Sequence, residues 1–134
     1  MPQIVVFDTN MLTVPAQFGV DIFEETKREL ERSVEFVVLS TVIEELERKL
    51  ETEPRTERMN FRIGLDLTKR CTIEEVDDTT KEIPVDDQIL QFAGSMNAVI
   101  ATNDKKLIRL AVSQGIPVLF LRGKKRLALR GTIS

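Results

Sequence analysis

The chain has 134 residues, enough for one domain with a single hydrophobic core, and its 42% hydrophobic and 31% charged residues are typical of soluble globular proteins. It contains no histidine and one cysteine, Cys71, which excludes histidine-based catalytic triads, histidine-ligated zinc and an intramolecular disulfide, and suits a reducing cytoplasm. The net charge of −3 is unusual for a protein that binds nucleic acid, and the lack of Trp and Tyr disfavours a surface that stacks bases. No apolar run approaches the roughly 20 residues needed to cross a membrane.

Four continuous apolar runs are typical of strands that are buried on both faces of a parallel sheet. These runs are 4–7, 36–39, 98–101 and 118–121. The segment 71–76 alternates between apolar and polar residues and predicts an outer strand. Apolar residues at helical spacing predict helices over 21–32, 41–50, 55–69, 86–96 and 104–113, while 9–20, with Pro15 and Gly19, is predicted to be a loop. This alternation predicts one domain, with a three-layer α/β/α fold around a five-stranded parallel sheet.

Acidic residues stand at the ends of several predicted elements. Asp8 directly follows the first apolar run, Glu45 borders the apolar stripe of a helix, Asp86 and Asp87 begin another helix, and Asp104 follows the fourth run. The carboxyl ends of parallel strands meet at one edge of the sheet, where such folds bind ligands, so we expect Asp8 and Asp104 to converge. Crowded, partly dehydrated carboxylates repel one another unless a cation compensates, so the sequence predicts a site for Mg²⁺ or Mn²⁺.

Each acid also has a purely structural interpretation. Asp8 is suited to an Asx turn and Asp104 to capping the helix that follows, and for either residue alone this role is as plausible as metal binding. Thr41 and Glu44 have the spacing of a capping box, which gives Glu44 a structural task and leaves Glu45 as the functional candidate. Four acids at the same end of the predicted strands nevertheless favour a shared site over separate caps.

Four short motifs, in this order along the chain, resemble the PIN domain, a family of metal-dependent ribonucleases. The motifs are Asp8-Thr9-Asn10, Val42–Leu46, Asp86–Leu90 and Ala101–Leu107, so the resemblance covers nearly the whole chain. The resemblance implies a catalytic quartet of Asp8, Glu45, Asp87 and Asp104, supported by Asn10, Thr102, Asn103 and Asp86. It also implies that Asp8, Asp87 and Asp104 bind Mg²⁺ or Mn²⁺. Helical spacing by itself does not decide which of Asp86 and Asp87 faces inward.

The double aspartate and the ending 117–127 resemble a branch of archaeal proteins akin to the ribosomal RNA processing factor Fcf more than the toxin branch of the family. The resemblance implies that RNA is hydrolysed by metal-activated water and that a basic segment holds the RNA backbone. The residues of this basic segment are Arg122, Lys124, Lys125 and Arg126. The alternative interpretation is that they are only the solvent-exposed end of the last strand. The competing functions are a catalytically silent RNA-binding scaffold in ribosome assembly and the toxin of a toxin–antitoxin pair. The expected partners are therefore RNA, an assembly factor or an antitoxin, and a second copy of the chain.

Overall fold

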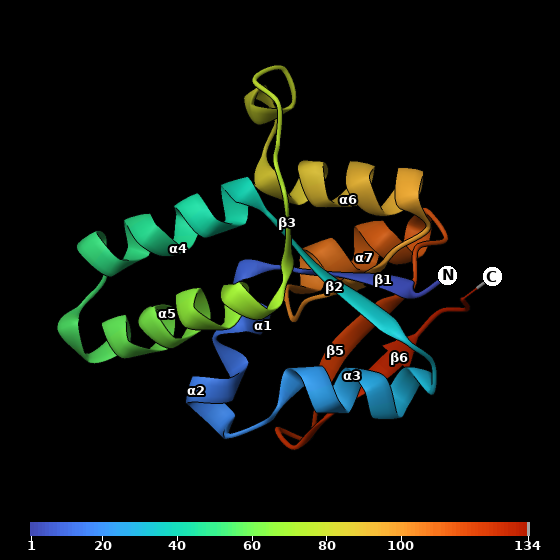
Figure 1. Cartoon of the computed structure of the whole chain (residues 1–134), viewed down its shortest axis with the longest axis horizontal. Helices are drawn as coiled ribbons and strands as arrows, with labels where there is room; N and C mark the ends of the chain where they lie inside the picture. The colour runs from blue at the N-terminus through green and yellow to red at the C-terminus, as the bar shows by residue number, and fades with distance from the viewer. Residues whose placement is uncertain (134) are drawn as a thin grey trace.

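A computed structural model of the chain describes residues 1–133. Its centre is a six-stranded sheet in the order β3-β2-β1-β4-β5-β6 (Figure 1). The strands are β1 (Gln3–Phe7), β2 (Val34–Leu39), β3 (Thr72–Glu74), β4 (Val99–Ala101), β5 (Val118–Arg122) and β6 (Arg126–Arg130). Strands β1 to β5 are parallel, whereas β6 pairs antiparallel with β5. The five predicted strands are all present. The sheet has one strand more than predicted, because β6 was not expected.

The helices are α1 (Thr9–Leu12), α2 (Val14–Phe18), α3 (Ile22–Leu30), α4 (Ser40–Thr52), α5 (Arg55–Leu67), α6 (Val85–Met96) and α7 (Lys105–Ser113). Two short 3₁₀ helices, η1 (Thr68–Arg70) and η2 (Thr80–Glu82), flank β3. The five predicted helices are all present. The predicted loop over 9–20 instead forms α1 and α2, because Asp8 caps the first and Pro15 occupies the first turn of the second, where its missing N–H is not needed.

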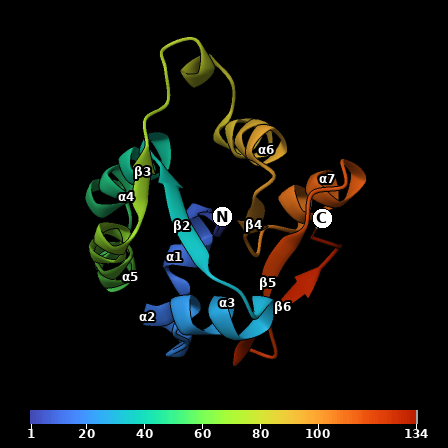
Figure 2. The ribbon, with the colours of Figure 1, turned by 45° about the vertical axis from the view of Figure 1, so that its right-hand side comes forward.

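The order of the strands reverses between β1 and β4. The chain moves outward from β1 through β2 to β3, and the crossover through α6 then returns it to the other side of β1. Right-handed crossovers therefore put α1 to α5 on one face of the sheet and α6 with α7 on the other, as Figures 1 and 2 show. The adjacent carboxyl ends of β1 and β4 form the switch point at which such sheets bind ligands.

The hydrophobic core lies between these layers and uses aromatic and aliphatic side chains from both. The Phe7 ring stacks on the Phe36 ring at 5.5 Å between centroids, and Phe23 of α3 meets both rings edge-on. Gly64 allows α5 to pack closely, because a Cβ there would make a tight contact of 3.2 Å with the backbone oxygen of Leu12. No helix within residues 1–133 is long and apolar enough to cross a membrane.

The basic end of the chain is a hairpin rather than a solvated strand end. Gly123 and Lys124, in the three-residue connection between β5 and β6, both adopt positive φ, of 64° and 58°. The following strand, β6, is covered along its outer edge by α3. There Glu25 and Glu29 accept hydrogen bonds from the amides of Leu127 and Leu129, at 3.2 and 2.9 Å.

Candidate functional site

The two predicted acids at the switch point converge. The Asp8 amide donates to the Ala101 carbonyl at 3.0 Å, which extends the pairing of β1 with β4 by one residue. Immediately beyond, the Thr102 hydroxyl donates to Asp8 Oδ2 at 2.8 Å and accepts from the Asp104 amide at 3.1 Å. The buried Thr102 therefore joins Asp8 to Asp104. Asp8 is only 6% exposed.

Two asparagines hold these loops in place. Asn10 Nδ2 donates to Asp8 Oδ2 at 3.1 Å, while Asn10 Oδ1 accepts from the Asn103 amide at 2.9 Å. Asn103 Oδ1 in turn accepts from the Leu121 amide of β5 at 2.7 Å. The structure thus gives Asn10 and Asn103 positions in one network that ties together the ends of three strands.

Asp104 combines the two roles that its position in the sequence suggested. Its Oδ1 accepts from the amides of Lys106 and Leu107, at 2.8 and 3.2 Å, and so caps α7. The same side chain lines the cavity at the switch point. Capping uses Oδ1, and Oδ2 accepts no hydrogen bond within residues 1–133.

The remaining acids of the site come from two helices on opposite faces of the sheet. Glu45 lies on α4 and Asp86 in the first turn of α6. Together with Asp8 and Asp104 they line one cavity of about 320 Å³. Its other lining residues are Thr9, Asn10, Thr13, Lys49 and Phe61. We call these four acids, Asp8, Glu45, Asp86 and Asp104, the acidic quartet.

The electrostatics of the site reflect this crowding. The pKa of Asp8 is raised from 3.8 to about 6, chiefly by burial; hydrogen bonds from Thr102 and Thr9 act to lower it, and the negative charges of Asp86 and Glu45 add to the rise. Burial is also the main cause that raises the pKa of Asp86, followed by the charges of Asp104 and Glu45. The carboxylates of the acidic quartet therefore repel one another across the cavity.

The structure puts Asp86, and not Asp87, at this cavity. Asp87 is exposed at the start of α6, whereas Asp86 is half-buried and lies on the same helical stripe as the buried Ile89, Leu90 and Ala93. The stripe of Asp87 includes Gln91 and Gly94, so helical periodicity did contain a signal for Asp86. Asp87 does not line this cavity, and the catalytic role that the family resemblance implies for it stays a prediction.

Glu45, and not Glu44, lines the cavity, although the capping box expected for Glu44 is absent. Glu44 is exposed and forms an ion pair with Lys81 at 3.4 Å. No capping box forms, because α4 begins at Ser40 and the Thr41 hydroxyl instead donates to Gln88 of α6. Glu45 is nevertheless the acid that reaches the cavity.

Comparison with known proteins gives the family of the chain. Residues 5–124 match the family model described as a PIN-like domain. The chain belongs to the PIN-like domain family. It is 32% identical over 130 residues to Ribonuclease VapC4 of Methanocaldococcus jannaschii, covering 96% of this chain and 98% of that protein. It is 33% identical over 122 residues to Ribonuclease VapC9 of Archaeoglobus fulgidus, covering 90% of this chain and 84% of that protein.

Solved structures give the same fold for this PIN-like domain. The PIN domain endonuclease Utp24 superimposes with a TM-score of 0.77 at 27% sequence identity, covering 99% of this chain and 95% of that one. A domain of a functionally unknown protein from Methanocaldococcus jannaschii superimposes with a TM-score of 0.60 at 20% identity, covering 90% and 92%. The second likeness concerns the fold alone. The α/β fold and the PIN-domain resemblance expected from the sequence are confirmed.

Four residues of the PIN-like domain line the cavity without having been predicted as site residues, namely Thr9, Thr13, Lys49 and Phe61. Lys49 lies one helical turn after Glu45, with its Nζ 5.4 Å from the centre of the Phe61 ring and 3.5 Å from Glu53 Oε1. Thr9 Oγ1 is buried without a hydrogen-bond partner in residues 1–133. Lys49 could have been predicted, because its i, i+4 spacing from Glu45 puts the two residues on the same face of the helix. The sequence pattern around Phe61 and Thr9 does not distinguish them from ordinary core residues.

The donor set of the cavity fits a hydrated hard cation. All four acids offer oxygen, which Mg²⁺ and Mn²⁺ prefer, and their mutual repulsion is relieved by positive charge. No three acids among residues 1–133 lie close enough together to bind one ion directly. Because Mg²⁺ keeps several of its waters, a cavity of about 320 Å³ suits an ion that is held partly through water. The unpaired Thr9 hydroxyl offers a further hydrogen bond at this site.

Proposed function

We propose that this PIN-like domain is an endoribonuclease that hydrolyses RNA phosphodiester bonds with Mg²⁺ or Mn²⁺. The observation that carries the proposal is the convergence of the acidic quartet on one cavity at the switch point of the sheet. Two relatives at 32% and 33% identity bear the name ribonuclease, which supports RNA as the substrate. A single half-buried cysteine, Cys71, is consistent with action in the cytoplasm.

The proposed chemistry assigns a task to each residue at the cavity. Asp8, Asp86 and Asp104 hold the ion, directly or through water, and Glu45 orients the attacking water. When bound, the ion polarises the phosphate and lowers the pKa of its water, so a chain without histidine needs no imidazole base. Hydrogen bonds from Thr102 and Asn10 orient the Asp8 carboxylate, and the bond between Asn10 and Asn103 holds the two loops together.

The first test of the proposal is cleavage of a mixed pool of structured and single-stranded RNA by the purified chain. Reactions contain Mn²⁺, Mg²⁺ or a chelator. We expect internal cuts with either metal and none with the chelator. Retention of RNA without cutting under all conditions would contradict the nuclease and support the scaffold of ribosome assembly. Four converging acids favour the enzyme, because a scaffold gains nothing from their mutual repulsion.

Lys49 is expected to bind the phosphate that the acids act on. We predict that Lys49→Gln lowers kcat/KM for RNA cleavage about tenfold, because it removes the positive charge that lines the cavity beside the acids. The matched control is Lys27→Gln on α3, which removes an exposed lysine away from the cavity. Unchanged kinetics for Lys49→Gln would mean that this lysine only ties α4 to α5.

The basic hairpin is expected to hold the RNA backbone. Arg122, Lys124, Lys125 and Arg126 are exposed at the turn between β5 and β6, at the carboxyl edge of the parallel strands. Changing Lys124, Lys125 and Arg126 to Gln should reduce the slope of log affinity against log salt by up to about 2, since each contact to a single-strand phosphate contributes about 0.7. Titration of a catalytically inactive variant with labelled RNA measures this slope. Loss of Lys27, Arg32 and Lys69 is the control, and an equal effect there would assign the change to net charge alone.

The substrate distinguishes a processing enzyme from a toxin. A processing nuclease should cut precursor ribosomal RNA at one or a few positions and leave growth unaffected when it is overproduced. A toxin should arrest growth, and a co-expressed antitoxin should restore it. Sequencing of RNA ends after induction in living cells separates the two, with the chain carrying a substituted acidic quartet as control.

A further inference from the structure

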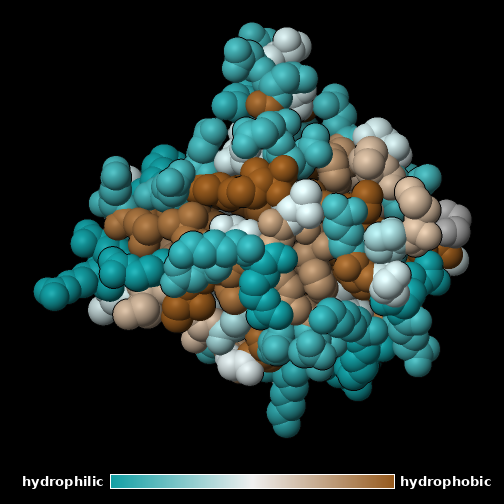
Figure 3. Space-filling view, in the orientation of Figure 1, coloured by the Kyte–Doolittle hydropathy of each residue, from teal (hydrophilic) through white to brown (hydrophobic). Residues whose placement is uncertain are grey.

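A second cavity, of about 420 Å³, adjoins the cavity of the acidic quartet. It lies between Arg48 of α4, Lys81 of the loop that carries η2, and residues 83–85 at the start of α6, and we call it the flanking cavity. The η2 loop projects beyond α4 and α6 in Figure 1, and its surface is mostly hydrophilic in Figure 3. Glu45 lines both cavities, so the flanking cavity begins where the proposed site of cleavage ends.

Arg48 provides the flanking cavity with a positive charge. No carboxylate within residues 1–133 forms an ion pair with it. Lys81, by contrast, lies 3.4 Å from Glu44, and the charges of these two residues offset each other. The other acid of the flanking cavity, Glu45, belongs to the quartet, whose charge a bound cation would offset. One guanidinium therefore remains for an anion, and its planar fork of N–H groups suits a phosphate.

The helix α4 directs two cations to opposite sides of Glu45. Residues three and four positions apart are neighbours on the surface of a helix, so Arg48 and Lys49 both lie one turn after Glu45. Lys49 lines the cavity of the acidic quartet, whereas Arg48 lines the flanking cavity. An RNA strand carries a phosphate on each nucleotide. Lys49 is thus placed for the phosphate that is cut, and Arg48 for the next phosphate along the strand.

The wall of the flanking cavity opposite Arg48 is apolar. It consists of Ile83, Pro84 and Val85, of which Ile83 and Val85 are half-buried. Gln88 also lines the cavity, but its side chain accepts a hydrogen bond from Thr41 and donates one to the Ile83 carbonyl. The cavity therefore offers a cation on one side and an apolar surface on the other, which matches the phosphate and the base of one nucleotide.

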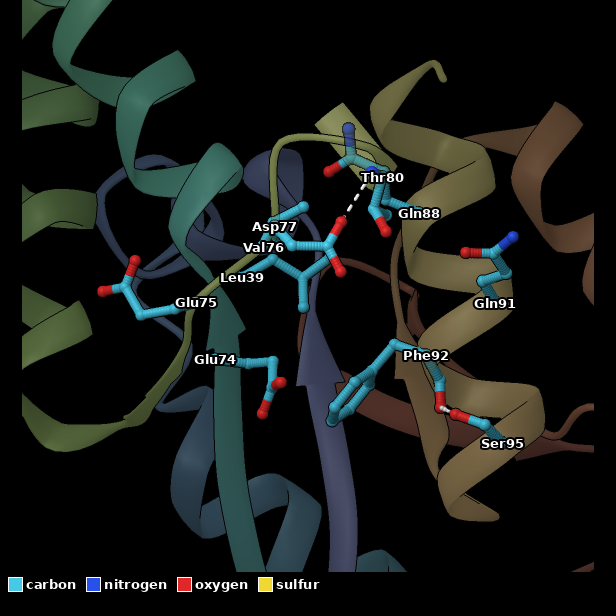
Figure 4. Close-up of a pocket in the computed structure, with 10 residues that line it drawn as sticks. All are labelled: Leu39, Glu74, Glu75, Val76, Asp77, Thr80, Gln88, Gln91, Phe92 and Ser95. Atoms are coloured by element: carbon cyan, nitrogen blue, oxygen red, sulfur yellow. Dashed lines mark hydrogen bonds between the residues drawn. The ribbon is translucent and has the colours of Figure 1, made fainter. Parts of the chain in front are cut away.

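The surface beyond Gln88 is unfavourable for RNA. Gln88 also lines a cavity of about 330 Å³ between β3 and α6, which Figure 4 shows. Glu74, Glu75 and Asp77 line this cavity as well, and none of them forms an ion pair in the described part of the chain. Their negative charges repel a phosphate backbone. The path of an RNA strand therefore does not continue toward β3.

We propose that the flanking cavity binds the nucleotide next to the phosphate that is cut. Arg48 holds the phosphate of this nucleotide, and the base packs against the apolar wall of residues 83–85. The inference rests on the proposed function, because it takes the acidic quartet as the place of cleavage. A base enters the cavity only when it is unpaired, so the RNA must be single-stranded at this position.

The experiment is a double-mutant cycle between Arg48 and one phosphate of the RNA. The cut in a short single-stranded RNA is mapped with Mn²⁺. In further RNAs a methylphosphonate on a 2′-deoxy sugar then neutralises one phosphate on either side of the cut, and the same sugar with an ordinary linkage is the reference. We expect Arg48→Gln and one of the two neutralised linkages each to lower kcat/KM about tenfold, and the combination to lower it no further.

Two variants serve as controls for this cycle. Lys49→Gln makes a matched charge change at the next residue of α4, and it should remain sensitive to the neutralised linkage, because Lys49 lines the other cavity. Arg32→Gln removes an exposed cation that precedes β2, at the opposite edge of the sheet, and should leave kcat/KM unchanged. The subsite is overturned if Arg48→Gln cuts RNA like the unchanged chain, or if its effect and those of both linkages simply multiply.

Binding provides a readout that does not require cleavage. In Ca²⁺, which also takes oxygen ligands, fluorescence anisotropy should show weaker binding of the labelled RNA by Arg48→Gln and a slope of log affinity against log salt reduced by about 0.7. A 4-thiouridine next to the cut should crosslink to residues 83–85, and crosslinks to the hairpin between β5 and β6 instead would overturn the subsite. Binding that depends on Arg48 without cleavage in any metal would support the subsite and contradict the nuclease. Equal binding by Arg48→Gln and the unchanged chain would contradict the subsite alone.

Discussion

Changing Asp86 to Asn is expected to lower RNA cleavage by about 100-fold or more, whereas Asp87→Asn should leave it within about twofold. Asp86 shares the cavity with Asp8, Glu45 and Asp104, and burial followed by the charges of Asp104 and Glu45 raises its pKa. Asp87 is exposed beside it. The two residues are adjacent in the first turn of α6, so each change removes one charge from the same helix N-terminus and the pair is matched.

Single-turnover cleavage at saturating Mn²⁺ and across a Mn²⁺ titration measures this difference. A weaker ion site raises the Mn²⁺ concentration needed for half-maximal cleavage, while a lost orienting role lowers the rate even at saturation. Equal losses at both positions would mean that α6 rotates when RNA binds. A loss at Asp87 alone would restore the assignment implied by the family resemblance and contradict the one based on burial.

The contrast between these two aspartates shows where the sequence is sufficient and where it is not. The convergence of Asp8 with Asp104 follows from the rule that parallel strands place their carboxyl ends together, so it could be predicted from two apolar runs and the residues after them. The inward acid of α6 depends on the rotation of one helix. Helical periodicity favours Asp86, but the buried Leu90 lies on the stripes of both aspartates. Gln88 of α6 is also buried and bonds to Thr41 and to the Ile83 carbonyl, and these contacts cannot be predicted from a local pattern.

The missed elements have a similar cause. The segment 9–20 was expected to be a loop because Pro15 and Gly19 are common in turns, yet each takes a position in which helices tolerate it, the first turn of α2 and its C-cap. The strand β6 was not predicted, because its charged residues suggested a solvent-exposed end of the chain. In the structure Arg126 and Arg130 are exposed while Leu127 is fully buried, so the strand is amphipathic and the basic residues remain available.

Asp8→Asn is expected to abolish metal-dependent cleavage and to change how stability depends on pH. Ionised Asp8 destabilises the metal-free fold, because its folded pKa of about 6 lies above the ordinary 3.8. Below pH 3.8 the carboxyl is neutral in both the folded and the unfolded state, and its destabilising effect is absent. Between the two values the folded state binds more protons, so stability falls as pH rises and reaches its low level above about pH 6.

The difference in unfolding free energy between the variant and the unchanged chain isolates this effect. It should move in favour of the variant by about 2 kcal/mol from about pH 4 to about pH 7, as expected from a shift of roughly two units. Hydrogen bonds that Asn cannot reproduce with Thr9, Asn10 and Thr102 offset the curve by a constant and leave its slope unchanged. Asp87→Asn, which removes an exposed carboxylate at the start of α6, is the control.

Urea denaturation with chelator, repeated across the pH range, measures both curves. Adding Mn²⁺ at neutral pH should then stabilise the unchanged chain and leave Asp8→Asn nearly unaffected, because a ligand that binds only the folded state adds to its stability. A flat difference across pH would show that Asp8 is ordinary in acidity and that the crowding of the acidic quartet carries no electrostatic cost. A variant that fails to fold at any pH would make Asp8 chiefly the cap of α1 and the anchor of the Thr102 network.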